Sequence, residues 1–259
     1  DQSSINQGYV TTWEWQFGDG FTQVIQHPAN PNISHVYNTP GTYLVTLTVT
    51  ASNGCQQSVI QQVEVQVNPI ANFTFPTDNC EQSPVIFTNT SQTNGGASLT
   101  SWYWNFGDPL SGSSNISYLQ SPTHIYNVGG SYDVMLIASN AWGCIDTIVK
   151  QVIISSKPTV SFTASTVCFG EPTQFSNTSV PNSGSLVTYD WDFGDGSPHS
   201  NIANPEHLYT AAGTWQVTLI VGNTPGCTSS VTQGVNVISL PTSAFTVSLQ
   251  NCEGAQVSF

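Results

Sequence analysis

The chain repeats one aromatic-rich phrase three times, in which two aromatic residues at alternate positions precede Phe-Gly-Asp. The three copies occupy residues 13–19, 102–108 and 189–195. Their central tryptophans, Trp15, Trp104 and Trp191, lie 89 and 87 residues apart. A period of this length exceeds the roughly 20 to 50 residues of a solenoid unit and matches a small domain. The repeat therefore predicts a tandem array in which each copy buries a core of its own.

Further features recur in the same order in every copy. Each phrase is followed by His-x-Tyr, by a glycine that begins an alternating strand pattern, and by a Gly-Cys pair. From the positions of these recurring features we expect four segments. These are a first repeat over 1–68 that lacks its strands A and B, complete repeats over 69–157 and 158–240, and the first two strands of a fourth repeat over 241–259.

The charge balance excludes several classes of partner. The chain has 15 acidic residues against 2 basic ones, and its formal net charge is −13. Nucleic acids and anionic lipid surfaces both attract clustered Lys and Arg, so we expect no nucleic-acid partner. The sequence has no run of about 18 apolar residues, and we expect no membrane insertion. Six cysteines recur in phase with the repeat, which is typical of disulfides in an oxidising extracellular compartment.

The strand pattern is clearest between residues 70 and 157. Residues 71–75 and 132–138 alternate as strands do, residues 99–106 place Trp102, Trp104 and Phe106 at alternate positions, and residues 145–154 follow a turn as the last expected strand. Side chains two apart in a strand share a face. Seven or so short strands in one period, with no helix, predict an all-β fold of tandem Ig-like antiparallel β-sandwiches placed end to end.

Three segments carry a family resemblance. They are the Trp-x-Phe-Gly-Asp-Gly phrase, the Pro-x-His-x-Tyr segment, and the Gly-Thr-Tyr-x-Val-x-Leu strand before an Asn-x-x-Gly turn. Together they resemble the PKD (polycystic kidney disease) domain, and the resemblance covers residues 1–259. The chain departs from the family pattern at Pro109, where the family has a second glycine, and at Trp215, where it has tyrosine. The recurring Gly-Cys pair is similar to that of PKD arrays in large bacterial cell-surface adhesins and filaments exported by type IX secretion.

The resemblance implies a non-catalytic role outside the cell. We expect a structural segment of a long extracellular or cell-surface repeat protein: a stalk, adhesin or filament. Its partners would be neighbouring copies or domains of the same fibre and a cell-surface anchor. The alternative is a carbohydrate-docking PKD accessory array of a secreted enzyme that degrades polysaccharide or protein.

The sequence favours no catalysis and no cofactor. It repeats no nucleophile–base pair, phosphate loop or carboxylate pair, and its polar candidates recur three times, whereas a catalytic site should be unique. One histidine per repeat cannot supply the four ligands of a closed zinc site. The Gly-Asp turns offer too few oxygen ligands to bind calcium. A calcium site at a domain junction, built from aspartate side chains and backbone carbonyls, remains an alternative.

The recurring rings are expected in the core. The predicted core residues are Trp15, Phe17, Trp104, Phe106, Trp191, Phe193, His35, His124 and His207. Trp142, in a turn, is instead the candidate for an exposed ring that stacks on a polysaccharide. Asp146-Thr147-Ile148 resembles the O-glycosylation signal of the bacteria named above, which makes Thr147 a candidate glycosylation site.

The six cysteines admit more than one pairing that respects the repeat. Cys80, Cys168 and Cys252 lie in early loops, and Cys55, Cys144 and Cys227 lie at late turns. Pairing within a domain gives Cys80–Cys144 and Cys168–Cys227. In an Ig-like sandwich these two loops lie about 17–20 Å apart, whereas a disulfide needs Cα atoms within about 7 Å.

The end of one domain does meet the beginning of the next. Cys80–Cys227, across the junction of the second and third repeats, is therefore favoured. Pairing within a domain through a rearranged first strand stays the alternative.

The chain begins and ends at nearly the same phase of the repeat. Asp1 aligns with Thr90, and Phe259 aligns with Phe87. Either the chain is a window of a longer array, or residues 242–259 complete the first repeat of the next copy by donor-strand assembly. The window is the favoured interpretation.

Overall fold

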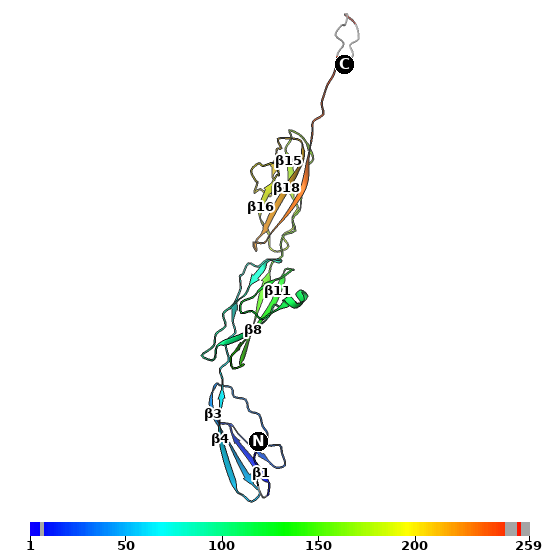
Figure 1. The fold of residues 1–259 in the computed structure, drawn as a ribbon. Coiled ribbons are helices and arrows are strands. Elements are labelled where there is room, and N and C mark those ends of the chain that lie inside the picture. Colours follow the sequence, from blue (N-terminus) through cyan, green and yellow to red (C-terminus); the bar gives the residue numbers. More distant parts are fainter. Residues whose placement is uncertain (6–7, 247–252, 255–259) are drawn as a thin grey trace. The chain divides into compact units, whose positions relative to one another are not determined.

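The computed structural model describes residues 1–5, 8–246 and 253–254, and nearly all of its regular structure is β-strand (Figure 1). The chain divides into two compact units. The first holds residues 1–74, 87–122 and 134–150, and the second holds residues 75–86, 123–133 and 151–259. The two strands predicted over 242–259, and Cys252, fall largely or wholly outside the described residues.

The described part of the first repeat forms one four-stranded antiparallel sheet, in the order β2-β1-β3-β4. Its strands are β1 (Val10–Gln16), β2 (Thr22–Gln26), β3 (Gly41–Ala51) and β4 (Gln56–Val65). The register places Trp15 opposite Leu47, and Leu47 opposite Val59. These three side chains therefore form one cross-strand row on one face of the sheet.

The second repeat has more, shorter strands. They are β5 (Phe73–Thr74), β6 (Pro84–Ile86), β7 (Thr88–Asn89), β8 (Leu99–Asn105), β9 (Ile116–Ser117), β10 (Thr123–Ile125), β11 (Gly130–Asn140) and β12 (Ile145–Ile154). They form a four-stranded sheet in the order β12-β11-β8-β9 and the pairs β5-β7 and β10-β6.

The expectation of no helix is wrong at one place. A 3-10 segment, η1 (Pro109–Asn115), follows Asp108. Pro109 stands where the other repeats have glycine, and proline at the first position of a helical turn loses no hydrogen bond because that N–H has no intrahelical partner.

The third repeat is a complete two-sheet sandwich. Its strands are β13 (Phe162–Ala164), β14 (Val167–Cys168), β15 (Thr173–Asn177), β16 (Leu186–Asp192), β17 (Glu206–His207), β18 (Gly213–Asn223) and β19 (Thr228–Ile238). One sheet has the order β13-β15-β17 and the other β14-β19-β18-β16. The pairs are antiparallel except β14 with β19, which is parallel. The predicted class, tandem all-β Ig-like sandwiches, is confirmed.

A tryptophan lies at the centre of this sandwich. The Trp191 ring packs against Phe162 and Phe175, with ring centroids 5.0 and 5.3 Å apart. All three side chains are buried, and burying a large apolar side chain stabilises a fold by about 2 to 3 kcal/mol. In the second repeat Trp104 is fully buried as well.

Trp15, the third of the predicted core tryptophans, is only half-buried. The described part of the first repeat has no strand that corresponds to β13 or β15, so no phenylalanine covers this ring as Phe162 and Phe175 cover Trp191.

Candidate functional site

The second unit contains a disulfide between Cys80 and Cys227, whose Cα atoms lie 5.6 Å apart. Cys80 lies in the first loop of the second repeat, and Cys227 follows the late turn of the third. This is the junction pairing that the sequence analysis favoured. Cys144 and Cys168, which the alternative pairings require, form no disulfide within the described chain, and neither does Cys55.

Next to the disulfide lies the linker of residues 155–157, and each of its backbone polar groups is hydrogen-bonded. Ser155 donates to Asn79 O at 2.8 Å and accepts from Glu81 N at 2.9 Å. Ser156 donates to the Ser183 hydroxyl and accepts from Asn223. Lys157 donates to the Glu81 carboxylate and accepts from Asn182. These partners come from both repeats, so the buried backbone groups of the linker are paired from either side of it.

Glu81 is a central residue of this site. One carboxylate oxygen accepts the Lys157 N–H at 3.0 Å, and the other accepts the Gly129 N–H at 2.8 Å. Gly129 must be glycine here, since a Cβ would lie 2.8 Å from the Ser156 backbone nitrogen.

Asn223 connects the linker to the turn that carries Cys227. Its side-chain oxygen accepts the Cys227 N–H at 3.0 Å, and its amide donates to the carbonyls of Ser156 and Pro181 at 3.0 and 3.1 Å. Only 1% of Asn223 is exposed, so these bonds also satisfy a buried polar group.

The same arrangement occurs in the first unit, before the second repeat. Asn140 accepts the Cys144 N–H at 3.0 Å and donates to Val67 O at 3.1 Å. The aligned residue of the first repeat is Ala51, which cannot make either bond. The Asn-x-x-Gly pattern by itself predicts a turn and does not indicate these bonds. The signal that could have identified this role is the return of asparagine at 140 and 223 but not at 51.

The recurring aspartate, histidine and tyrosine form a cluster, called here the Asp-His-Tyr cluster, that is held by hydrogen bonds and ring stacking. His207 Nε2 lies 2.7 Å from Asp195 Oδ2, its ring stacks on Phe193 at 4.0 Å, and Tyr209 donates to Phe193 O at 3.2 Å. In the first repeat His35 and Asp19 lie 2.6 Å apart, with Tyr37 donating to Phe17 O at 3.0 Å. His124 and Asp108, the corresponding residues of the second repeat, are both buried.

In the first and third repeats, the Asp-His-Tyr cluster shifts the pKa of its aspartate and of its tyrosine. The hydrogen bond from His35 is the main cause that lowers the pKa of Asp19. Burial works to raise the pKa of Asp195, but hydrogen bonds from Ser197 and His207 outweigh it, and the net pKa is lowered. Burial raises the pKa of Tyr37 and of Tyr209. These two carboxylates accept hydrogen bonds from the turn that follows them and from the histidine ring, and such bonds favour their charged form.

Two further candidate residues, Trp142 and Thr147, belong to the first unit. Trp142 is 53% exposed in the turn before Cys144, and Thr147 is exposed on β12. Among the described residues no three His, Cys, Asp or Glu side chains gather as metal ligands would. Nor does that part of the chain contain a helix long and apolar enough to span a bilayer.

The family model of the PKD domain matches three consecutive segments, residues 1–67, 66–154 and 155–238. Among curated proteins, polycystin-1 of Homo sapiens is 36% identical over 105 residues. That stretch is 39% of this chain but spans only 2% of polycystin-1.

Two solved single domains are similar to parts of the chain. The PKD1 domain of Vibrio anguillarum Epp is 31% identical with a TM-score of 0.31, covering 33% of this chain and 99% of that domain. The PKD1 domain of the Vibrio cholerae metalloprotease PrtV is 26% identical with a TM-score of 0.29, covering 34% and 98%.

Proposed function

Because the chain belongs to the PKD domain family, we propose that it is a non-catalytic structural segment of a long extracellular repeat protein, and that it carries tension along that protein. The observation that carries this proposal is the linker of residues 155–157, whose backbone groups are all bonded beside the Cys80–Cys227 disulfide.

The disulfide gives tension a covalent route past most of two sandwiches. A pull on the two ends of the chain reaches Cys80, crosses to Cys227 through the sulfur atoms, and continues into β19. The residues between the two cysteines, a sequence separation of 147, are outside this route. Strands β6 to β18 would therefore bear no load when the two ends of the chain are pulled.

The acidic surface supports placement outside the cell as part of an adhesin, stalk or filament. A net charge of −13 favours solubility, and disulfides persist in oxidising compartments. Export by type IX secretion, a cell-surface anchor and contacts with neighbouring copies belong to the same proposal, as does glycosylation at the exposed Thr147.

Single-molecule force spectroscopy on the full chain tests this function. With the disulfide intact, residues 81–226 add nothing to the extension. Reduction should then lengthen the fully extended chain by roughly 500 Å, at about 3.6 Å per residue. Cys168→Ser, which leaves the disulfide in place, is the matched control. Equal extension of the oxidised and reduced chains would overturn the proposal.

A second function, docking on carbohydrate, is favoured by one observation. The Trp142 ring is 53% exposed, and exposed indoles stack on sugar faces. A pull-down on chitin and cellulose with the chain and with Trp142→Ala decides it. Saturable binding that the variant loses supports docking, and no binding by the parent chain rejects it for these polysaccharides.

A further inference from the structure

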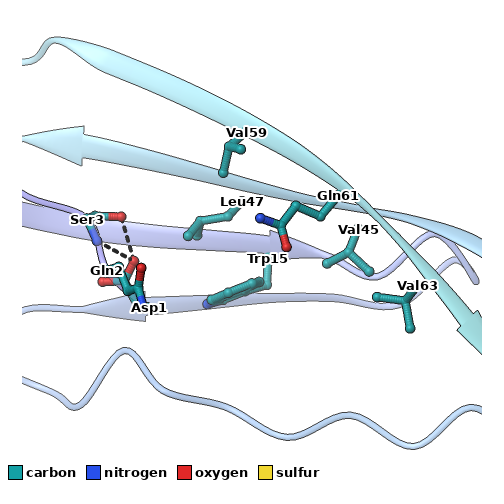
Figure 2. A pocket seen from close by; sticks show the side chains of 9 residues that line it. All are labelled: Asp1, Gln2, Ser3, Trp15, Val45, Leu47, Val59, Gln61 and Val63. Carbon is teal, nitrogen blue, oxygen red and sulfur yellow. Dashed lines mark hydrogen bonds between the residues drawn. The ribbon is translucent and has the colours of Figure 1, made fainter.

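Each repeat has one sheet face that carries the core tryptophan and an outer face on the other side. In the first repeat, Trp15 and Leu47 lie opposite each other on the first of these faces (Figure 2), and the aligned Trp191 of the third repeat is a core residue. Side chains one position along a strand point to the other side of the sheet. Glu14 and Thr48, which also lie opposite each other, are therefore on the outer face.

The outer face is apolar in the second repeat. Where the first repeat has Glu14 and Thr48, the second has Tyr103 and Ile137. The apolar residues of this side, called here the outer apolar face, are Tyr103, Ile116, Tyr118, Met135, Ile137 and Val149. Tyr118 is 69% exposed and Val149 is 53% exposed. Large exposed apolar patches of this kind mark interaction sites.

The strand register makes these residues neighbours. Tyr103 of β8 lies opposite Ile137 of β11, and its ring packs against Tyr118 with centroids 5.7 Å apart. The backbone bond that closes the hairpin of β11 and β12 puts Val149 opposite Met135. The outer apolar face is therefore one continuous surface across β9, β8, β11 and β12.

The charge on this side of the sheet indicates what kind of partner fits. The first repeat has Glu14 here and the third has Asp190 and Asp192, whereas the second has Tyr103 and Asn105 at the aligned positions. Carboxylates would attract a basic partner, so their replacement favours a partner that is itself acidic or neutral. A second copy of this chain, with a net charge of −13, is such a partner, and it meets least repulsion where the carboxylates are replaced.

The size of the face sets the strength of the contact. Four strands at a spacing of about 4.8 Å, with the 7 residues of β8 at about 3.3 Å each, span roughly 15 by 23 Å. That is roughly 350 Å² per copy, against about 800 Å² for each partner in a standard interface. The contact is therefore weak and reversible. Asp133, the next outward residue of β11, lies at the polar rim that such interfaces have.

We propose that the outer apolar face of the second repeat binds the same face of a second copy of this chain. A twofold axis parallel to the strands would bring Tyr103 and Tyr118 of one copy onto Met135 and Val149 of the other. An interface whose two sides are the same surface closes at a dimer. The inference rests on the proposed contact between neighbouring copies and names its surface, and it is independent of the load-bearing role of the disulfide.

Sedimentation equilibrium of the full chain tests the proposal. The average mass should rise with concentration from 27.8 kDa toward twice that value and should not exceed it. Added salt should strengthen the association, because it screens the repulsion between two acidic copies. The chain is produced without glycosylation, since a glycan at Thr147 on β12 would cover the face.

Variants copied from the third repeat keep the fold while changing the face. Tyr103→Asp introduces the residue found at Asp190, and it should weaken the association by at least about tenfold because it puts a charge into each half of the interface. Met135→Thr introduces the residue found at Thr218 and should weaken the association less. Ser230→Asp is the matched control. It adds the same charge to the outer face of the third repeat and should associate as the parent does.

Four outcomes overturn the proposal. Three are a parent chain that is monomeric at its highest soluble concentration, association that weakens with salt, and Tyr103→Asp associating as the parent does. The fourth is binding to chitin or cellulose that Tyr103→Asp loses and Trp142→Ala keeps, because the face would then belong to a polysaccharide. None of these outcomes alters the extension measured with and without the disulfide, so the two proposals fail separately.

Discussion

Asn223 Nδ2 donates to the carbonyl oxygen of Ser156 at 3.0 Å, while the Oδ1 of the same side chain accepts the Cys227 N–H. One buried amide thus joins the linker to the turn that holds half of the disulfide. The bond recurs between Asn140 and Val67, which makes it a repeated device of the array and not an accident of one junction.

Asn223→Ala should destabilise the third repeat by about 2 to 3 kcal/mol. The change leaves buried carbonyls without a donor, and each unsatisfied buried group costs about 1 to 3 kcal/mol. Urea unfolding followed by tryptophan fluorescence measures it. Asn53→Ala is the matched control, because Asn53 bonds the Cys55 N–H on an exposed turn, and it should cost less than about 1 kcal/mol. Equal losses of stability for the two variants would contradict this role of Asn223.

Gly194→Ala should cost clearly more than Gly196→Ala. Both glycines have positive φ, 77° and 80°, so each variant pays about 1 to 2 kcal/mol for the left-handed backbone. A Cβ at 194 would also meet the Gln216 carbonyl oxygen at 2.3 Å, whereas nothing lies within 4 Å of one at 196. The difference between their free energies of unfolding isolates the close approach. Equal free energies of unfolding for the two variants would mean that β18 moves away from the added Cβ without loss of stability.

Stability should fall in acid because of Asp19 and Asp195. Both have a pKa lowered in the folded state, so folding favours their charged form. This contribution is fully present above the unfolded pKa of about 3.9. It is lost as pH falls from there through the lowered folded pKa. Thermal unfolding from pH 6 down to about 2 measures the slope.

Asp19→Asn with Asp195→Asn should flatten that slope. Glu64→Gln, which removes an exposed carboxylate of β4, is the control and should leave it nearly intact. If the double variant loses stability with falling pH as steeply as the parent does, other carboxylates are responsible for the loss.

Removing the disulfide should loosen the linker and lower stability. The closed loop has a sequence separation of 147, and chain entropy gives such a cross-link at most about 5 kcal/mol. Hydrogen exchange at residues 155–157 should speed up in Cys80→Ser/Cys227→Ser and stay slow in Cys168→Ser. Unchanged exchange in the double variant would show that Glu81 and Asn223 hold the linker unaided.

Much of the fold could be predicted from the repeat pattern. The alternating runs predicted the strands, and β12 has the bounds that were expected, residues 145–154. The topology argument favoured Cys80–Cys227, the pair that the structure joins. Periodicity could not predict the η1 turn at Pro109, because a loop has no period, nor the half-buried state of Trp15, because burial depends on strands elsewhere in the chain.

The sequence alone determined the class, the period and the family, since hydrophobic alternation and turn residues act over short distances along the chain. Only the tertiary structure decided which side chains meet across long separations. Glu81 reaches Lys157, Asn223 reaches Ser156, and Lys150 reaches the carbonyl of Phe73. These contacts follow from how strands stack and turn, and a one-dimensional pattern of polar and apolar residues does not contain that information.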